Sequence, residues 1–538
     1  MRSFIIFTLL TNSMLFTGLN SVTLAQALNK NYISENQNKI DIIKYDLLID
    51  ISVPDKKITA EINITGLILD SSLNSIDLNF YDQLHITGLL LNGSEANYIH
   101  NKTTLSIPVI DFINDTFNLQ INYDGKPKSF GPVGFVFGEV NKRSLVYTLN
   151  QPEYASTWLP CNDIPSDKAM LEIKIRNTKE NISVSNGKLI EVIEDETHKT
   201  YHWKTYYPIS TYLISIYSAP YEYFNDNLII NDDTLAIKYY VMPEHLENAR
   251  KDFAVHNDMI KYFSDTFGSY PFMKEKYGVA EFLWNFGAME HQTITGIGYT
   301  FVSGNNFFRD IYAHELAHQW WGNAVGLKSW DDVWLNEGFA TYSEALYNEH
   351  KFGKDALRSF MLSKFDENFS GTLYKPEKHF GSMVYDKGAW VLHMLRYEVG
   401  DSIFFKILRT YFEQFKYSSA SVYDFKDICE LIAQKNLSGF FDQWVFTGDD
   451  QIKLEYSFDV TANNIHYLLT INAEQVQTGY KEYHFPIEFK IIYEDGSEEI
   501  LSTNINFRNQ KSDFELMKKP VDLIPDPSNQ LLANFRLK

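Results

Sequence analysis

The chain has 538 residues, enough for roughly three domains with sizeable cores, and its formal net charge at pH 7 is −21. This acidity argues against nucleic acid or an anionic membrane surface as a partner. The only two cysteines, Cys161 and Cys429, lie far apart in the sequence, which favours two isolated buried thiols over a disulfide framework.

The first 27 residues have the features of an export signal. Arg2 gives a thin basic start, residues 4–19 are mostly apolar, and residues 25–27 form an A-x-A cleavage site. We therefore expect a periplasmic or extracellular protein that is cleaved after Ala27. A retained membrane anchor is the alternative, which the shortness of the apolar run disfavours, and no later segment is apolar enough to span a bilayer.

From residue 40 to residue 223 the pattern predicts strand after strand. Residues 42–50, 58–64 and 117–123 are rich in β-branched and aromatic side chains, and Asn-Gly, Asp-Gly and proline-containing turns separate the strands. The sequence thus begins, after the export signal, with an all-β domain.

The period changes further along the chain. Residues 244–267 carry apolar side chains at helical spacing, and helix-like segments dominate through Trp444. Alternating strands return at 454–458 and 467–471 and continue to the end. This last part is long enough for a small β-sandwich.

A possible metal site lies in the helical part. His314, Glu315 and His318 form H-E-x-x-H, and Glu337 follows 18 residues after the second histidine. On a helix, histidines at i and i+4 share one face, so both imidazoles can reach one cation. Two neutral nitrogens and a carboxylate suit Zn²⁺ and leave its fourth position open for water, while Glu315 could take a proton from that water.

The alternative is an ordinary amphipathic helix with solvated His and Glu side chains. Phe307, Ile311, Leu316 and Trp320 fall at helical spacings that would place them on a buried side. Gly322 and the following Asn then supply a helix stop signal. The pattern favours a helix that carries a zinc site.

Four further segments make the chain resemble the aminopeptidase N-type zinc exopeptidases, the gluzincins of peptidase family M1, which also include the leukotriene hydrolases. They are residues 287–291, similar to the G-x-M-E-N exopeptidase motif; 314–323, the extended zinc helix; 384–388, which bears the catalytic Tyr in the family; and 151–163, similar to the substrate-facing segment of the N-terminal domain. Order and spacing agree over about residues 40–450.

Two departures from the family pattern stand out. The exopeptidase motif ends in His291 where the family has Asn. The chain also ends at residue 538, so we expect a short form without the large helical C-terminal domain of many relatives. Its active site would then be more open, or closed by a partner subunit.

The resemblance implies an α+β multidomain fold with three folded parts. These are an N-terminal β-domain at 28–225, a thermolysin-like, mainly helical zinc catalytic domain at 226–450, and a small C-terminal β-sandwich at 451–538, after a signal peptide at 1–27.

The resemblance also implies roles for the metal-site residues. His314, His318 and Glu337 would hold one zinc ion per chain. Glu315 would accept the proton of the attacking water and pass it to the leaving amine. Tyr385 would stabilise the oxyanion of the tetrahedral intermediate, although an ordinary core tyrosine is the alternative from the sequence alone.

Substrate recognition would involve a second group of residues. Glu290 and Glu153 would bind the free α-ammonium of the substrate, and Gln151 would bind its backbone. The remaining substrate-binding positions of the exopeptidase-like motif are Gly287, Ala288 and Met289. Asp386, Lys387 and Asn336 are interpreted as structural supports.

Together these features predict an exported metallo-aminopeptidase that acts on peptides with a free N-terminus. Two alternatives stay open: a zinc hydrolase of the same scaffold that acts on another substrate, such as a lipid epoxide, and a non-catalytic binding protein. The pattern indicates neither an oligomeric state nor a preferred N-terminal side chain.

Overall fold

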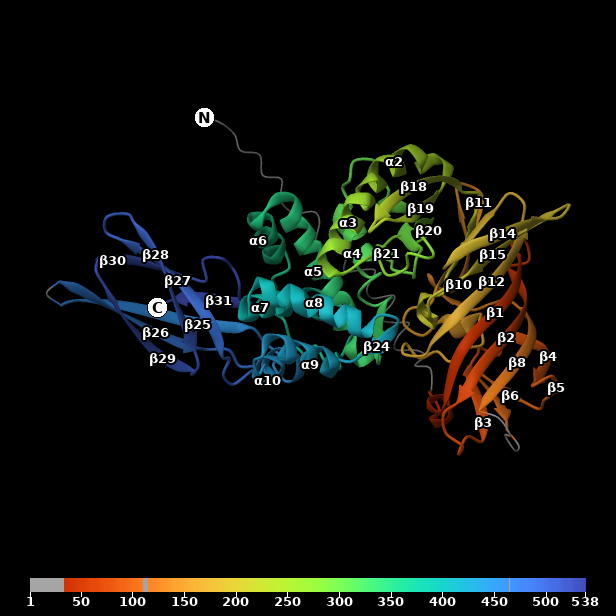
Figure 1. Ribbon diagram of the computed structural model, residues 1–538, viewed down its shortest axis with the longest axis horizontal. Coiled ribbons are helices and arrows are strands. Elements are labelled where there is room, and N and C mark those ends of the chain that lie inside the picture. Colours follow the sequence, from red (N-terminus) through yellow and green to blue (C-terminus); the bar gives the residue numbers. More distant parts are fainter. Residues whose placement is uncertain (1–32, 110–114, 464) are drawn as a thin grey trace. The chain divides into compact units, whose positions relative to one another are not determined.

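The computed structural model describes residues 33–109, 115–463 and 465–538 (Figure 1). The predicted signal peptide at 1–27 lies outside these described residues. The chain forms two compact units, Met1–Ser329 with Phe415–Ser419 and Trp330–Gln414 with Ala420–Lys538. The domain limits expected at 225 and 450 stay predictions.

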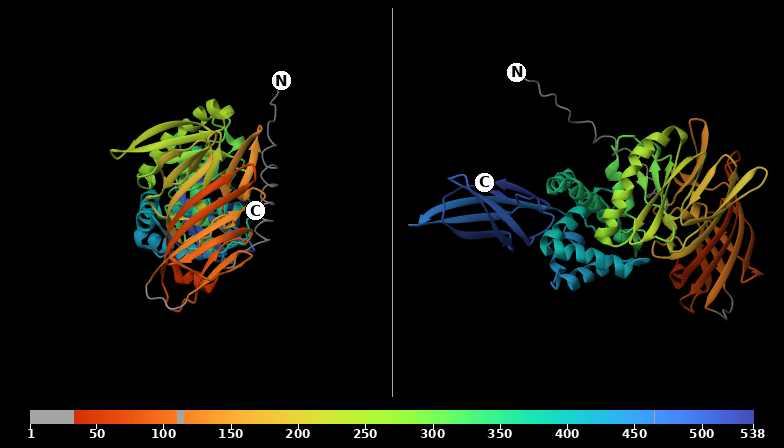
Figure 2. Two further views of the ribbon diagram at one scale, coloured as in Figure 1. Left: turned by 90° about the vertical axis from the view of Figure 1, so that its right-hand side faces the viewer. Right: turned by 45° about the horizontal axis from the view of Figure 1, so that its top comes forward.

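A nine-stranded sheet is the largest element of the first unit. Its side chains alternate between an interior face and a solvent face, as the strand period requires: Tyr45 and Leu47 of β1 are buried, whereas Lys44 forms an ion pair with Glu172 at 2.9 Å on the outer face. Figure 2 shows the red and orange strands of this sheet side by side. Across the sheet the strands are β14 (Lys188–Glu194), β15 (His198–Lys204), β12 (Lys168–Thr178), β1 (Ile40–Ser52), β2 (Lys57–Ile68), β8 (Thr116–Gly125), β4 (Leu84–Leu91) and β5 (Ser94–Glu95), with β16 (Ile209–Ser210) paired to β12.

Two smaller sheets and three short 3₁₀ turns complete this all-β region, which confirms the predicted β-structure. One sheet contains β13 (Ile182–Ser185), β17 (Ile216–Ala219), β11 (Arg143–Leu149), β10 (Val133–Val140) and β9 (Ser129–Phe130). The other contains β3 (Ser75–Asn79), β7 (Thr104–Pro108) and β6 (Ile99–Asn101). The turns are η1 (Glu35–Lys39), η2 (Ala155–Thr157) and η3 (Thr211–Leu213).

A mixed five-stranded sheet follows in the same unit. Its order is β18 (Glu222–Ile230), β19 (Asp233–Val241), β20 (Tyr277–Phe282), β22 (Thr295–Gly298) and β21 (Ala288–Met289). Every residue of β20 is buried, so both faces of the sheet are covered and the strand shows no alternation that sequence reasoning could detect. The edge strand β21 carries part of the exopeptidase-like motif.

Helices of the first unit lie beside this sheet in Figure 1. The helical period expected for 244–267 is confirmed. The elements are η4 (Pro243–His245), α2 (Leu246–Asp252), η5 (Phe253–Val255), α3 (His256–Phe267), η6 (Tyr299–Phe301) and α4 (Arg309–Ala317), followed by the short strands β23 (Val325–Leu327) and β24 (Ser418–Ala420).

The second unit begins with helices. They are η7 (Trp330–Asp332), α5 (Trp334–Phe352), α6 (Lys354–Ser363), η8 (Met383–Lys387), α7 (Gly388–Val399), α8 (Asp401–Phe415), α9 (Val422–Ala433), α10 (Ser438–Phe441) and η9 (Asp442–Phe446). Most of α5 is buried, which makes it the central helix of this group. Both η8 and η9 are π-helical turns.

The second unit ends in two small sheets, drawn in blue in Figure 1. Alternate residues of β27, among them Ile487, Phe489 and Ile491, are buried, so each sheet has one interior face, as in a β-sandwich. One sheet contains β29 (Asn509–Leu516), β26 (His466–Gln475), β25 (Ile452–Asn463) and β31 (Ala533–Leu537). The other contains β28 (Glu498–Ile505), β27 (Phe485–Tyr493) and β30 (Pro520–Pro525).

The two cysteines behave as expected. Cys161 and Cys429 are both buried and free. Within the part of the chain that the structure describes, no helix is both long and apolar enough to cross a membrane.

Candidate active site

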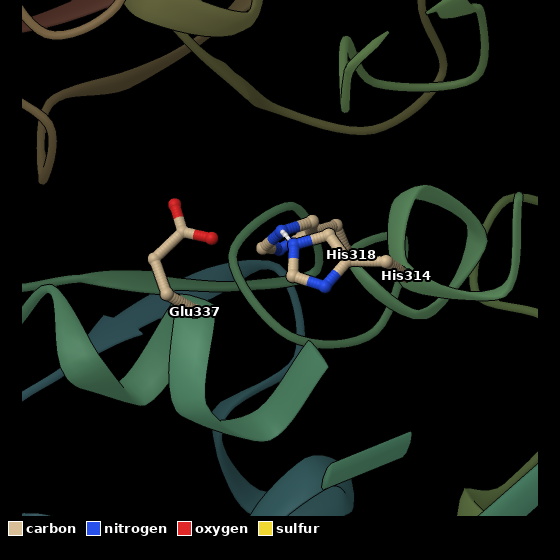
Figure 3. A group of neighbouring side chains, drawn as sticks. All are labelled: His314, His318 and Glu337. Atoms are coloured by element: carbon tan, nitrogen blue, oxygen red, sulfur yellow. Dashed lines mark hydrogen bonds between the residues drawn. The ribbon is translucent and has the colours of Figure 1, made fainter. Parts of the chain in front are cut away.

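The three predicted metal ligands lie together (Figure 3). One ligand atom each from His314, His318 and Glu337 lies within 4.8 Å of the other two. The two imidazole rings are 4.7 Å apart between centroids, and their Nε2 atoms are 3.1 Å apart. Among the described residues, no other group of three or more His, Cys, Asp or Glu side chains is arranged in this way.

The arrangement of these atoms fits a zinc ion. The Trp321 carbonyl accepts a hydrogen bond from Nδ1 of His318 at 2.9 Å, so Nε2 of His318 carries the lone pair that a metal needs. With Zn–N bonds of about 2.0–2.1 Å, two ligands of a tetrahedral site stand about 3.3 Å apart. The observed 3.1 Å between the Nε2 atoms is close to that separation. Two histidines and one carboxylate leave one coordination position for a reactant.

A buried aspartate fixes the loop that leads into α4. Asp252 is fully buried, and its carboxylate accepts hydrogen bonds from the backbone N–H groups of Ser303 at 2.6 Å, Gly304 at 2.7 Å and Asn306 at 2.7 Å. The role of Asp252 was not predicted from the sequence. A usable signal exists, because an acidic residue at the C-terminal end of a helix such as α2 opposes the helix dipole and so suggests a tertiary role.

One expectation for the buried side of α4 is wrong. Leu316 and Trp320 are fully buried, but Phe307 is 73% exposed. Asn306, just before it, has a left-handed backbone with φ of 60°, and the helix starts only at Arg309. Phe307 therefore belongs to the preceding turn and does not share the helical phase of the apolar side chains.

Helix α4 also ends earlier than the stop signal suggested. Regular α-helix ends at Ala317, and His318 is the C-cap residue. The chain then continues in turns to Gly322, whose φ of +113° permits the reversal. His318 keeps its place above His314 because its backbone N–H still bonds the His314 carbonyl at 3.2 Å.

Glu315 lies inside the protein, only 6% exposed. Its charge contributes to the raised pKa values of two buried tyrosines of the same unit, Tyr217 and Tyr277. Burial raises the pKa of Tyr217 well above its usual value, and nearby charges, including those of Glu315 and Glu290, raise it further. Burial likewise raises the pKa of Tyr277, with a smaller contribution from Glu315. Both phenols therefore stay neutral next to the candidate base.

The exopeptidase-like motif forms the edge of the mixed sheet. Ala288 pairs with Ile297 and Met289 with Gly296 in antiparallel register. Gly287 precedes this strand, and its carbonyl accepts a hydrogen bond from Gly298 at 3.0 Å. Glu290 follows the strand and is only 4% exposed.

Side chains from beyond the H-E-x-x-H motif hold the end of the exopeptidase-like motif. Asn323 donates from Nδ2 to the Glu290 carbonyl at 2.6 Å. Gln319 donates from Nε2 to the carbonyls of Glu290 at 3.5 Å and His291 at 3.4 Å. The same segment that carries the two histidines of the metal site therefore positions Glu290. The roles of Gln319 and Asn323 were not predicted from the sequence.

The structure brings Gln151 and Glu290 together. Gln151 donates a hydrogen bond from Nε2 to Oε1 of Glu290 at 2.9 Å. Glu153 lies two residues further along and is half-buried. After burial, the Glu153 charge contributes to the raised pKa of Tyr154.

Tyr385 lies in the π-helical turn η8 and is half-buried. The Lys387 side chain is fully buried and donates from Nζ to the carbonyls of Gly371 at 3.1 Å and Gly448 at 3.0 Å. Burial lowers the pKa of Lys387 to about 8. These bonds secure the turn, as the interpretation of Lys387 as a structural support requires.

Two glycines set the distance between α5 and α7. A Cβ at Gly338, directly after Glu337, would lie 2.9 Å from the Gly388 Cα, which is closer than any Cβ contact allows. Gly388 in turn follows Tyr385 by three residues. The close approach therefore brings together the helix that carries Glu337 and the turn that carries Tyr385.

Comparison with known proteins supports this assignment. The peptidase M1 N-terminal domain matches residues 41–213, and the peptidase family M1 domain matches residues 252–444. The metal site and the two family matches together identify the chain as a metallopeptidase. The chain belongs to peptidase family M1.

Individual relatives agree with the family. A protein of Sulfurisphaera tokodaii named "Probable aminopeptidase 2" is 28% identical over 352 residues, which cover 61% of this chain and 44% of that protein. The chain spans about half the length of the curated relatives it matches.

Solved structures share the fold. A Legionella pneumophila aminopeptidase A in complex with aspartic acid superimposes with a TM-score of 0.83 at 19% identity, over 94% of this chain and 60% of that one. An M1 zinc metallopeptidase from Deinococcus radiodurans gives a TM-score of 0.66 at 26% identity, over 76% of this chain and 93% of that one.

Proposed function

We propose that the protein is a zinc-dependent aminopeptidase that releases the N-terminal residue from peptides. The observation that carries this proposal is the meeting of His314, His318 and Glu337, with Glu315 between the two histidines in the chain. The aminopeptidase names of the relatives support it as well.

In this proposal each site residue has a chemical task. His314, His318 and Glu337 would hold one Zn²⁺ per chain, which supplies Lewis acidity that lowers the pKa of water and polarises the scissile carbonyl. The Glu315 carboxylate accepts a proton from the attacking water and delivers it to the nitrogen of the leaving amine. The Tyr385 hydroxyl donates a hydrogen bond to the oxyanion as it develops.

Recognition of the free N-terminus falls to Glu290, assisted by Glu153. A buried carboxylate binds an ammonium group by charge-assisted hydrogen bonding. The Gln151 amide occupies Oε1 of Glu290 and so restricts the rotation of that carboxylate. The peptide backbone next to the amine would then lie along Gly287 and the edge-strand residues Ala288 and Met289.

A substrate panel tests the proposal. Each aminoacyl group is attached to one chromophore and offered to the purified protein, with the N-acetylated forms beside it. We expect turnover of the free-amine substrates, about one zinc per chain by elemental analysis, and loss of activity on chelation. Active protein without metal would contradict the zinc assignment, and turnover of a lipid epoxide without any aminoacyl substrate would contradict the substrate class.

We also propose that the protein is exported. The support is the basic start at Arg2, the apolar residues 4–19 and the A-x-A sequence at 25–27. Expression of the full chain should yield a mature protein outside the cytoplasm whose N-terminal residue is Leu28. Retention of Met1 on a membrane-bound product would show an uncleaved anchor instead.

A further inference from the structure

The residue that ends the exopeptidase-like motif differs from the family pattern and has an unusual environment. His291 is fully buried, and its Nδ1 lies 2.5 Å from the hydroxyl of Tyr217. The Nε2 atom is buried and has no hydrogen-bond partner in the described residues. Burial lowers the pKa of His291 to about 3, so the ring is neutral at any pH at which the enzyme would work.

A neutral imidazole has one protonated nitrogen, and Tyr217 determines which one. If Nδ1 carried the proton, it would donate to Tyr217, and both the Tyr217 hydroxyl hydrogen and the Nε2 lone pair would lack partners. If Tyr217 donates to Nδ1 instead, only the Nε2–H group is left over. An unsatisfied buried polar group costs about 1–3 kcal/mol, so the second arrangement is favoured.

This tautomer makes histidine equivalent to asparagine in hydrogen bonding. An Asn side chain offers a carbonyl acceptor and an NH2 group, of which one N–H is enough for a single acceptor–donor pair. A histidine held as the Nε2–H form offers the same pair, with Nδ1 as the acceptor and Nε2–H as the donor. His291 can therefore stand where the family motif has Asn, provided that a donor faces its Nδ1.

The surrounding strands are shaped to supply that donor. Tyr217 comes from β17 of the all-β region, and its hydroxyl passes over Gly296 of β22. A Cβ at Gly296 would lie 2.2 Å from the Tyr217 oxygen, so any larger residue there would displace the hydroxyl. The Tyr217 and His291 rings also meet edge to face, with centroids 5.6 Å apart.

We propose that His291 is a positioning residue for Glu290, held by Tyr217 as the neutral Nε2–H tautomer. The bond between its side chain and Tyr217 fixes His291, which directly follows Glu290 in the chain. Gln319 and Asn323 hold the backbone carbonyls of Glu290 and His291. The effect of His291 on substrate binding rests on the proposed function, whereas the tautomer does not.

The tautomer can be read directly from proton–nitrogen correlation spectra of the full-length metal-loaded protein, labelled at its histidine ring nitrogens. His256 is a matched internal control: it is also fully buried, and its Nδ1 lies 3.1 Å from the Phe253 carbonyl, which can only accept. We expect His256 as the Nδ1–H form and His291 as the opposite Nε2–H form. The same tautomer at both residues would overturn the proposal.

Tyrosine variants identify the group that sets the tautomer. Tyr217→Phe should alter the His291 signals. Tyr277→Phe, which removes another buried hydroxyl from the mixed sheet, should leave them unchanged, because Tyr277 donates to Thr295 at 3.2 Å. Unchanged His291 signals in Tyr217→Phe would overturn the role of Tyr217.

Kinetics then test the positioning role. His291→Ala and Tyr217→Phe should raise KM for free-amine substrates by about tenfold with a smaller change in kcat, because Glu290 is misplaced. His291→Asn should stay within about threefold of the parent KM, since Asn keeps both the acceptor and the donor. An unchanged KM in folded His291→Ala would overturn the positioning role.

If His291→Ala does not fold, Tyr217→Phe and His291→Asn carry the kinetic test, and a KM in His291→Asn as poor as that of Tyr217→Phe would contradict the equivalence of the two side chains. If the parent protein cleaves no aminoacyl substrate, the proposed function fails, while the spectra still decide the tautomer.

Discussion

The two histidines of the metal site and Glu290, the proposed amine anchor, lie in the same unit, but their positions depend on different ranges of the sequence. His314 and His318 are placed by one helical turn, so four residues of local structure bring their Nε2 atoms to 3.1 Å. Glu290 is placed by side chains from well-separated segments, among them Gln151 and Asn323. Local geometry therefore places the histidine pair, and long-range packing places the proposed recognition residue, which predicts that metal binding and substrate binding can be impaired separately.

The largest effect should come from a substitution in the locally formed H-E-x-x-H motif. Glu315→Gln removes the proton acceptor but no metal ligand, so kcat should fall by roughly 10²–10⁴-fold while the zinc content stays at that of the parent. Steady-state kinetics and elemental analysis on one preparation measure both. Glu247→Gln on the exposed surface of α2 is the matched control, and a near-normal kcat in Glu315→Gln would refute the assigned base.

The role proposed for Glu290, which long-range packing places, is tested by blocking the substrate amine. N-acetylated aminoacyl substrates should be cleaved at least ~10³-fold more slowly than free ones, about 4 kcal/mol, because the buried Glu290 carboxylate loses its cationic partner. Glu290→Ala should narrow this ratio by harming the free-amine substrate most. If the ratio of kcat/KM values is the same in Glu290→Ala as in the parent, Glu290 is not the amine anchor.

Tyr385 offers a third test with a smaller expected effect, because this residue is proposed to bind neither the metal nor the substrate amine. Tyr385→Phe should reduce kcat by on the order of 10²-fold and affect KM less, since the phenol acts on charge that develops only in the transition state. Tyr423→Phe, at a largely exposed tyrosine of α9, should change neither value. A normal kcat in Tyr385→Phe would leave the oxyanion without its assigned donor.

The smallest effect is expected at Asn323, which follows the histidine segment and holds the backbone of Glu290. Asn323→Ala removes the 2.6 Å bond to the Glu290 carbonyl and leaves all three metal ligands intact. KM for free-amine substrates should rise by about tenfold with zinc content unchanged. Asn225→Ala, on the exposed edge strand β18, should have no such effect. Loss of zinc in Asn323→Ala would show that the two supports are not separable.

This contrast also explains what sequence reasoning could predict. The two ligand histidines follow from a helical spacing, and strands such as β1, β2 and β26 follow from alternation, because both patterns are periodic within a few residues. The supports Asp252, Gln319 and Asn323 follow no period, since each acts across a turn or between elements. Strand β20 escaped detection because it is buried on both faces and shows no alternation.

The exposed Phe307 shows the same limit at the scale of single residues. Its spacing of four residues to Ile311 fits a helix, yet a left-handed residue at Asn306 interrupts the phase before the helix begins. Spacing indicates a shared face only while the backbone keeps one conformation, and the sequence did not reveal where that conformation starts.

The contact between Gly338 and Gly388 has a consequence for evolution and for protein engineering. Neither helix has a side chain at this point, and a Cβ added at either glycine would lie 2.9 Å from the Cα of the other, so a single methyl group is enough to force the two helices apart. Gly338→Ala or Gly388→Ala would act as a spacer that shifts Tyr385 relative to Glu337 without changing either. The glycine pair thus constrains the sequence of both helices at two positions that carry no chemistry of their own.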